Sequence, residues 1–310
     1  EYPSGMSVNT ELAARYTGIK PEQIVVGNGA AELINTYMKI SQEQKTGIIL
    51  PTFEEYPNRL NEKNIEYYIP SNRDFSYTSS DLIEYFDSKD ITQLLIINPD
   101  NPSGNLLTKE ELVSLIEWSK NKGIRLIIDE SFLDFSHPDK SLSLLDTATL
   151  NQNPHLIIVK SISKSYGVPG LRLGFLASGD KQLIKTIKKE VSIWNINSFA
   201  EFYMQIFIKY QEDYEKACVK FIEERDLFFS QLQQIPFLRV IPSEANYFLC
   251  EIADNYTSEE LCSTLLSQKN ILIKNCKAKA GFQKRNYVRI AIRNREDNNK
   301  LVEALLQLTK

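Results

Sequence analysis

A lysine with phosphate-binding neighbours stands in the segment SISKSYGVPGLRLG, residues 161–174. The amine of Lys164 is the kind of group that condenses with a carbonyl to form a Schiff base. Ser161 and Ser163 offer hydroxyl groups beside it, and Arg172 offers a guanidinium group that binds phosphate through two hydrogen bonds. This set suits a phosphorylated aldehyde. Taken alone, the S-x-S-K pattern also fits an ordinary solvated loop.

The residues before this segment predict where Lys164 lies. Residues 156–159 are Leu, Ile, Ile and Val, set between Pro154 and polar residues, which is typical of a short buried strand. Lys164 therefore follows a strand end. In an open parallel sheet, ligands bind in the crevice outside the carboxyl ends of the strands. The sequence thus places Lys164 where a ligand would bind.

A second phosphate-binding element is predicted near the start of the chain. Residues 24–26 form a brief apolar strand that leads through a GxG turn into a helix with apolar residues on one face. The N–H groups at a helix N-terminus point toward an anion, and the helix dipole favours negative charge there. A GxG turn alone is often simple turn chemistry. Combined with residues 161–172, it makes a predicted phosphate cradle of the backbone of Gly29, Ala30 and Ala31.

Two more predicted strands end in polar residues. Residues 94–97 lead into NPDNPSG, residues 98–104, where two X-Pro steps force a rigid polar turn. Residues 125–128 lead into Asp129, whose carboxylate also fits a helix or turn cap when it is taken alone. Both ends are expected at the same edge of the sheet as Lys164.

In this order, the motifs resemble those of the class I and class II aminotransferases of fold type I, which use pyridoxal 5′-phosphate (PLP). The segment SISKSYGVPGLRLGF is similar to the family's lysine motif, and NPDNPSG is similar to its N-P-x-N-P-[ST]-G pattern. The resemblance covers nearly the whole chain. It is greatest to the branch that holds histidinol-phosphate aminotransferase and threonine-phosphate decarboxylase. It implies PLP as the cofactor and Lys164 as the catalytic residue.

The resemblance also implies the other cofactor contacts. Asp129 would pair with the protonated pyridine nitrogen, which lets the ring draw electrons from the substrate, and Asn101 would bond O3′. Of the two aromatic residues after the strand at 47–50, Phe53 and Tyr56, we expect Tyr56 to stack on the ring. Tyr2 is expected to reach the cofactor phosphate of the other subunit, although surface coil fits it equally well. The phosphate would be held by Gly29, Ala30, Ala31, Ser161, Ser163 and Arg172.

Substrate contacts are expected from the C-terminal part of the chain. The resemblance implies that Arg289, in YVRIAIR, receives a substrate anion, and Lys274 stands where the branch often has another arginine. Asn197 ends a WNIN segment that resembles a substrate-proximal W-S-x-N motif. Together with Arg293, Arg289 and Lys274 offer more positive charge than one substrate carboxylate needs. A small amino compound that carries phosphate or phosphonate is therefore the expected substrate.

Phe132 departs from the family pattern. Many aminotransferases of this class place a tyrosine three residues after the aspartate to bond O3′, and a phenyl ring cannot do so. The threonine-phosphate decarboxylase branch accepts phenylalanine within a similar D-E-x-F-x-D-F run. This difference bears on the choice of reaction.

Composition excludes several other classes of protein. The chain has 310 residues, of which 42% are hydrophobic and 25% are charged, as in ordinary soluble proteins. A net charge of −4 argues against a basic nucleic-acid-binding face. No membrane-spanning run or signal-like segment is present, so we expect a cytoplasmic protein without a membrane partner. No metal is expected, because only His137 and His155 accompany four scattered cysteines, which we expect to be buried or free thiols: Cys218, Cys250, Cys262 and Cys276.

The order of predicted elements indicates an α/β fold. The resemblance implies a large, mainly parallel seven-stranded domain with one antiparallel strand at residues 1–200, and a small α+β domain at residues 236–310. A linking helix is expected at residues 201–235, within an unbroken helix from about 198 to 234. A further strand is expected at residues 271–273. We also expect a homodimer whose N-terminal arm is absent, cleaved, or replaced by a fused N-terminal domain.

Three functions agree with these residues. The first, which we prefer on the breadth of the family, is an aminotransferase in which Lys164 moves a proton as general acid and base. The second is a decarboxylase similar to L-threonine-O-3-phosphate decarboxylase, which would remove a carboxylate in place of a proton. The third is a PLP-binding regulatory domain of a fusion protein. The full set of chemical residues disfavours the third, because binding alone does not require it.

Overall fold

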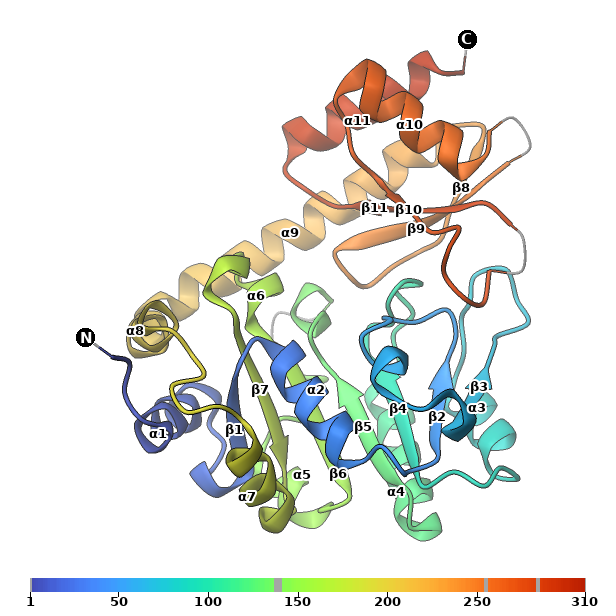
Figure 1. Cartoon of the computed structure of the whole chain (residues 1–310). Coiled ribbons are helices and arrows are strands. Elements are labelled where there is room, and N and C mark those ends of the chain that lie inside the picture. Colours follow the sequence, from blue (N-terminus) through green and yellow to red (C-terminus); the bar gives the residue numbers. More distant parts are fainter. Residues whose placement is uncertain (1, 137–140, 254–255, 283–284, 310) are drawn as a thin grey trace.

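Two β-sheets, joined by one long helix, organise the chain in the computed structural model (Figure 1). The structure describes residues 2–136, 141–253, 256–282 and 285–309. We call the part built on the seven-stranded sheet the large unit and the part built on the four-stranded sheet the small unit. Helix α9, Gln211–Leu232, runs from the large unit to the small one.

The large sheet has the strand order β1-β7-β6-β5-β4-β2-β3. Strand β7 is antiparallel to both of its neighbours, and the other pairs are parallel, as predicted. Most of its strands are buried along nearly their whole length, which explains their continuous Ile, Leu and Val runs. The strands are β1 Ile24–Asn28, β2 Thr46–Ile49, β3 Ile65–Tyr68, β4 Gln93–Ile97, β5 Arg125–Asp129, β6 Leu156–Ser161 and β7 Leu173–Ser178.

Helices cover both faces of this sheet. Side chains of α2 and α7 pack on one face, and those of α1, α3, α4, α5 and α8 pack on the other. A capping box of Thr108 and Glu111 opens α4, and Gly123 ends it in a left-handed conformation. Thr78 caps α3. The helices are α1 Met6–Thr17, α2 Ala30–Ile40, α3 Ser79–Phe86, α4 Lys109–Lys122, α5 Thr147–Gln152, α6 Ile162–Ser165 and α7 Lys181–Glu190.

The expected unbroken helix from 198 to 234 is wrong. The structure has α8 at Ser198–Ile206, a 3₁₀ turn at Phe207–Tyr210, and then α9. Neither glycine nor proline causes the break. Phe207 is buried and lies 4.8 Å from the Tyr16 ring and 4.6 Å from the Tyr166 ring, measured between centroids. The break therefore lies where an aromatic side chain packs into the large unit, which a helical pattern does not reveal.

The small sheet has the order β10-β11-β9-β8 and is antiparallel throughout. The strand predicted at residues 271–273 is wrong, because Asn270 takes a left-handed conformation and the Ile271 N–H still caps the preceding helix at Leu265 O. Its elements are β8 Leu238–Val240, β9 Tyr247–Ile252, α10 Ser258–Lys269, β10 Lys274–Asn275, β11 Tyr287–Ala291 and α11 Arg295–Gln307.

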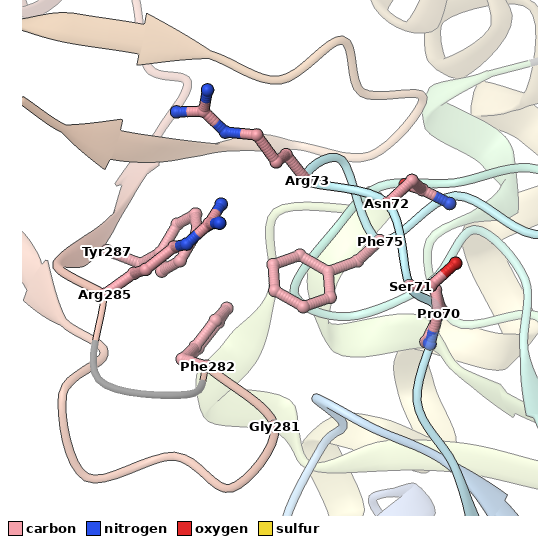
Figure 2. A pocket seen from close by; sticks show the side chains of 9 residues that line it. All are labelled: Pro70, Ser71, Asn72, Arg73, Phe75, Gly281, Phe282, Arg285 and Tyr287. Carbon is pink, nitrogen blue, oxygen red and sulfur yellow. The ribbon is translucent and has the colours of Figure 1, made fainter.

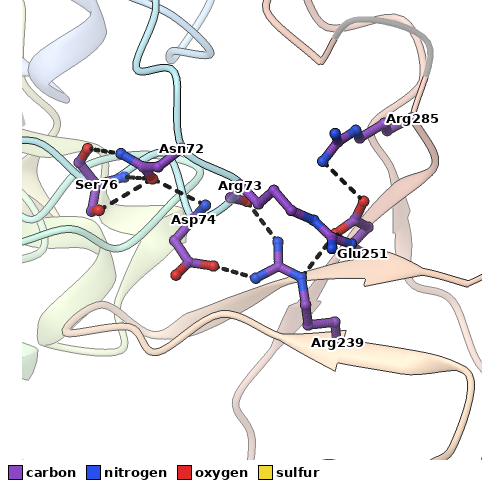
Figure 3. Close-up of polar contacts among 7 residues, drawn as sticks. All are labelled: Asn72, Arg73, Asp74, Ser76, Arg239, Glu251 and Arg285. Carbon is purple, nitrogen blue, oxygen red and sulfur yellow. Dashed lines mark hydrogen bonds and ion pairs between the residues drawn. The ribbon is translucent and has the colours of Figure 1, made fainter.

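An ionic cluster joins the two units (Figure 3). Glu251, on β9, accepts from Arg73 of the large unit at 2.8 Å and from Arg239 of the small unit at 2.8 Å, and pairs with Arg285 at 3.5 Å. Arg239 also pairs with Asp74. A shallow pocket beside this cluster is lined from both units, with Phe75, Phe282 and Tyr287 among the side chains that face one another (Figure 2).

Glu251 keeps its charge in this setting. Burial acts to raise the pKa of Glu251, but the nearby Arg239 and Arg73 hold this pKa below its ordinary value. A depressed carboxyl pKa contributes stability that is present above the unfolded-state pKa and lost as the pH falls through the folded-state pKa. The cluster therefore stabilises the contact between the units at neutral pH.

We predict that Glu251→Gln lowers the free energy of unfolding by about 1–2 kcal/mol, because three guanidinium groups lose their shared carboxylate. The expected fall in Tm is about 2–6 °C at neutral pH. The deficit should shrink as the pH falls, because the wild-type carboxylate is then protonated. The control is Glu259→Gln, which removes an exposed ion pair with Lys277 and should change Tm far less. Equal losses in both variants would contradict this role of Glu251.

Candidate active site

Three strand ends meet at one edge of the large sheet. In the strand register, Ile97 pairs with Asp129 and Asp129 pairs with Val159, so the residues that follow β4, β5 and β6 emerge at the same level. Lys164 lies in α6, directly after β6. This is the arrangement that the strand ends predict.

Two donors fix the carboxylate of Asp129. Its Oδ1 accepts the Ser131 N–H at 2.9 Å, and its Oδ2 accepts the Tyr56 hydroxyl at 2.8 Å. Burial, and then the negative charge of Asp129, raise the pKa of Tyr56 above its ordinary value, so its hydroxyl stays protonated and donates. Asp129 is therefore held at the bottom of the site by a hydroxyl that the sequence alone did not assign to it.

The structure gives Phe53 and Tyr56 different surroundings from those expected. Tyr56 is 0% exposed and has no free ring face to offer a ligand. Phe53 is only partly buried, and its ring centroid lies 5.7 Å from Lys164 Nζ. The expected stacking role of Tyr56 therefore does not fit this geometry, and Phe53 is the aromatic residue that borders the site. The two rings follow the same strand three residues apart, and only packing distinguishes them.

The Lys164 amine lies against an aromatic wall. Its Nζ is 4.5 Å from the centroid of the Phe132 ring, where many relatives in the family pattern would have a tyrosine. Loss of solvation lowers the pKa of Lys164, and the charges of Arg289 and Arg172 lower it further, against the opposing effect of Asp129. The amine is thus tuned toward the neutral, nucleophilic form.

The N-terminus of α2 and Arg172 form one cradle. The Gly29 N–H donates to the Arg172 carbonyl at 2.7 Å, and a Cβ added to Gly29 would lie 2.4 Å from Arg172 Nη2. Gly174 is equally constrained, since its Cβ would lie 2.2 Å from the backbone nitrogen of Ala30. Glycine at both positions lets the guanidinium group and the helix end approach each other, while the first N–H groups of α2, those of Ala30 and Ala31, lack intrahelical acceptors.

Ser161 and Ser163 lie beside this cradle and are both buried. The Ser161 N–H donates to the Ser131 hydroxyl at 2.9 Å. Among the described residues, the buried Oγ of Ser163 has no hydrogen-bond partner. A buried hydroxyl without a partner is costly, and an anion held in the cradle would satisfy it.

The small unit supplies Arg289 and Lys274. Arg289 Nη1 donates to Asn101 Oδ1 at 2.7 Å, across the junction of the two units. Lys274 pairs with Arg289 in the antiparallel register, so both side chains lie on the same face of the small sheet. The structure thus brings both predicted substrate cations to one place, with Arg289 in contact with the NPDNPSG turn.

Asn197 and Tyr2 make contacts with residues other than Lys164 in the described part of the chain. Asn197 caps α8 by accepting the Ala200 N–H at 3.0 Å, and it donates to the Leu171 carbonyl at 2.8 Å. Tyr2 is 79% exposed and stacks on Trp194 with ring centroids 4.5 Å apart. Both assignments remain predictions.

A buried ion pair below the lysine loop was missed by sequence reasoning. Lys160 Nζ donates to Asp134 Oδ1 at 2.7 Å, and the Ser165 hydroxyl donates to Asp134 Oδ2 at 2.8 Å. Burial acts to raise the pKa of Asp134, but Lys160 and Ser165 keep this pKa below its ordinary value. The pair ties the end of β6 and the last residue of α6 to one carboxylate. A charged residue inside the apolar run of β6 was the available signal.

Among the described residues, the structure contains no disulfide bond and no cluster of His, Cys, Asp and Glu suited to a metal ion. His155 contacts the Ile116 carbonyl at 3.1 Å, and His137 lies outside the described residues. In that same part of the chain, no helix has the length and apolar character needed to cross a membrane.

Comparison with known proteins identifies the family. The model of the family "Aminotransferase class I and II" matches residues 5–305. The chain belongs to the class I and II aminotransferase family. The predicted family, branch and fold are therefore confirmed, and the protein is a PLP-dependent enzyme of this class.

Three similar proteins represent the branch. The L-serine phosphate decarboxylase of Sulfurospirillum multivorans is 32% identical over 100% of this chain and 79% of its own length. The threonine-phosphate decarboxylase of Salmonella typhimurium is 31% identical over 95% of this chain and 79% of its own length. The crystal structure of the histidinol-phosphate aminotransferase from Clostridium acetobutylicum has a TM-score of 0.86 and 28% identity, covering 99% of this chain and 90% of that one.

The residues at the site of this family member fit PLP. The cradle of Gly29, Arg172 and the α2 N-terminus offers donors for a phosphate, and Ser163 offers a buried hydroxyl that lacks a partner. Asp129 supplies a fixed carboxylate, and Lys164 supplies an amine with a lowered pKa. The donor set therefore matches a phosphorylated aldehyde that carries a basic ring nitrogen.

We predict that Asp129→Asn lowers the pKa of Lys164 in the cofactor-free protein, because it removes the negative charge that opposes the burial and the two arginines. The measurement is the pH dependence of Lys164 acetylation by acetic anhydride, read by peptide mass spectrometry. The control is Asp87→Asn, which alters an exposed carboxylate paired with Lys122 and should leave the Lys164 profile in place. An Asp129→Asn profile that is unchanged, or displaced to higher pH, would contradict the electrostatic account.

Proposed function

We propose that this protein is a PLP-dependent decarboxylase that acts on a small phosphorylated amino acid of the L-serine phosphate type. The observation that carries the proposal is the similarity to an L-serine phosphate decarboxylase over the whole length of the chain. The aminotransferase that we preferred from the sequence becomes the second candidate. It keeps support from the family model and from a structural neighbour that is an aminotransferase.

The charges around Lys164 support a substrate with two anionic groups. Arg172 lies in the cradle that fits the cofactor phosphate, which leaves Arg289 and Lys274 for the substrate. Arginine holds a phosphate or carboxylate through a planar pair of donors, and lysine adds a flexible positive charge. A substrate with both a phosphate and a carboxylate matches two adjacent cations better than a simple amino acid does.

The residues of this chain would divide the work of the reaction. Bound PLP supplies the electron sink that makes loss of carbon dioxide possible. Asp129 would hold the ring nitrogen protonated, Asn101 would bond the ring hydroxyl, and Phe53 would cover one face of the ring. Lys164 Nζ would give a proton to the substrate carbon after the carboxylate has left. Phe132 would keep water from that amine.

The reaction would depend on which anion of the substrate Arg289 holds. If Arg289 holds the substrate phosphate, the α-carboxylate would be left without that guanidinium and would be the group that is lost. If Arg289 holds the α-carboxylate, that group would be retained, the α-hydrogen would be removed instead, and transamination would follow. We propose the first arrangement.

We also propose that the protein acts as a homodimer in the cytoplasm, with domains at residues 1–200 and 236–310 linked by residues 201–235. Exposed apolar side chains support a second copy as the partner. They lie on α1 and α8, which pack together, and on the segments next to these helices, where Tyr2 stacks on Trp194. Ile193 and Phe199 are each 76% exposed, and Tyr2 is the residue expected to act across subunits. We call this set of residues the apolar patch: Tyr2, Val8, Ile193, Trp194, Phe199, Phe202, Ile208 and Tyr210.

We predict that the PLP-loaded protein converts L-serine phosphate into O-phosphoethanolamine and one equivalent of carbon dioxide, with the aldehyde form of the cofactor regained after turnover. Lys164→Ala should lower kcat by about 10²–10⁴-fold, the range for loss of a general acid and base. Carbon dioxide capture and the cofactor absorbance spectrum are the measurements. The control is Lys181→Ala, at an exposed surface lysine.

Accumulation of an oxo acid with a lasting pyridoxamine form would favour the second candidate instead. Full activity of Lys164→Ala would contradict the assignment of the catalytic lysine under either reaction.

We predict that Phe199→Glu shifts the protein from dimer to monomer in sedimentation-velocity experiments, because it places a charge in the apolar patch. The control is Leu272→Glu, at a residue that is 78% exposed on the small unit and outside the patch. A Phe199→Glu protein that remains dimeric, or a wild-type protein that is monomeric, would contradict the assignment of this patch to a second copy.

A further inference from the structure

Tyr247, in the small unit, contacts residues of the large unit at the candidate active site. It is the first residue of β9 and is 3% exposed. In the register of β9 and β11, Tyr247 pairs with Ala291 and Leu249 pairs with Arg289. Tyr247 is thus a diagonal neighbour of Arg289 on the same face of the small sheet, which is within reach of long and aromatic side chains.

The ring of Tyr247 packs against the substrate anchor. The Arg289 guanidinium carbon lies 4.8 Å from the centroid of the ring. A planar guanidinium group over an aromatic face is attracted by the ring quadrupole, and the contact restricts the planes that the group can adopt. The ring therefore limits the orientation of the cation that is proposed to hold the substrate phosphate.

The hydroxyl of Tyr247 reaches the large unit. It donates to the backbone carbonyl of Asp100 at 2.8 Å, and Asp100 immediately precedes Asn101 in the NPDNPSG turn. Burial raises the pKa of Tyr247, so the hydroxyl keeps its proton and remains a donor. Arg289 donates to Asn101 and packs on the Tyr247 ring. Contacts therefore link Tyr247, the Asp100–Asn101 turn and Arg289 to one another.

The same ring also touches the wall behind the catalytic amine. Tyr247 and Phe132 meet edge to face, with centroids 5.2 Å apart and an interplanar angle of 82°. Phe132 in turn lies 4.5 Å from Lys164 Nζ. The Tyr247 side chain therefore contacts Arg289, the NPDNPSG turn and Phe132.

We propose that Tyr247 is a positioning residue that fixes the Arg289 guanidinium relative to Asn101 and Lys164, and thereby sets the affinity of the site for the phosphate-bearing substrate. The proposal rests on the proposed function in one respect, the assignment of Arg289 to the substrate anion. A residue that only filled the core would not need its hydroxyl, because phenylalanine has the same ring. The bond to Asp100 across the two units is what distinguishes positioning from packing.

The test compares two tyrosine-to-phenylalanine variants of the PLP-loaded protein. Tyr247→Phe removes the bond to the Asp100 carbonyl. The matched control, Tyr256→Phe, removes a bond of the same kind within the small unit, from the Tyr256 hydroxyl to the Leu308 carbonyl at 3.0 Å. Each change removes one hydroxyl and one hydrogen bond to a backbone oxygen.

Positioning predicts that Tyr247→Phe raises KM for L-serine phosphate by about five- to tenfold, as for one lost hydrogen bond, with kcat within about twofold and PLP affinity unchanged. Tyr256→Phe should lower Tm without a change in KM. A Tyr247→Phe enzyme with wild-type KM, or equal KM increases in both variants, would overturn the proposal.

A second measurement separates this proposal from the proposed reaction. The probe is 3-phosphoglycerate, which carries the phosphate and carboxylate of L-serine phosphate but has a hydroxyl in place of the amine, so it binds without reacting at the cofactor. Calorimetry should show the same five- to tenfold weakening in Tyr247→Phe, whether or not the wild-type enzyme releases carbon dioxide. If the binding difference is found but no carbon dioxide is released, the decarboxylase assignment is wrong and the positioning role stands. Equal binding by wild type and Tyr247→Phe, or no binding by wild type, overturns the positioning role.

Discussion

A hydrogen bond between residues 188 positions apart sets the geometry of this enzyme. Arg289 belongs to the small sheet and Asn101 to a turn of the large one, so the bond is made only when the two units sit at one distance and angle. The Glu251 cluster and the bond from Tyr247 to Asp100 are further contacts between the two units. The site is therefore shared between the units, and its substrate side depends on contacts that lie outside the cofactor cradle.

Buried polar groups on the large sheet give the cofactor side its rigidity. Asp129 is held by a hydroxyl and a backbone N–H, and Asp134 by Lys160 and Ser165. Breaking such a buried pair is far more costly than breaking a surface pair, because a charge is left without solvent or partner. These contacts tie down the segment that carries Lys164, and burial and nearby charges lower the pKa of its amine.

The sequence predicted the features that depend on residues close together in the chain. Apolar runs located buried strands of the large sheet, and the strand-end rule grouped Lys164, Asp129 and Asn101. It could not predict the break at Phe207, which reflects distant aromatic packing, or choose between Phe53 and Tyr56, which share a strand end and differ only in burial. Tyr247 carried no signal because its partners lie in other parts of the chain. The choice between decarboxylation and transamination depends on substrate orientation, which a residue pattern does not encode.

We propose that this site removes a carboxylate, rather than a proton, from a phosphorylated amino acid. Proton NMR of the reaction with L-serine phosphate in deuterium oxide tests it directly. Decarboxylation predicts O-phosphoethanolamine with a single deuteron on the carbon that bears the amine, while the remaining substrate keeps its α-hydrogen. Deuterium at the α-carbon of the remaining substrate, together with an oxo acid product, would contradict the account.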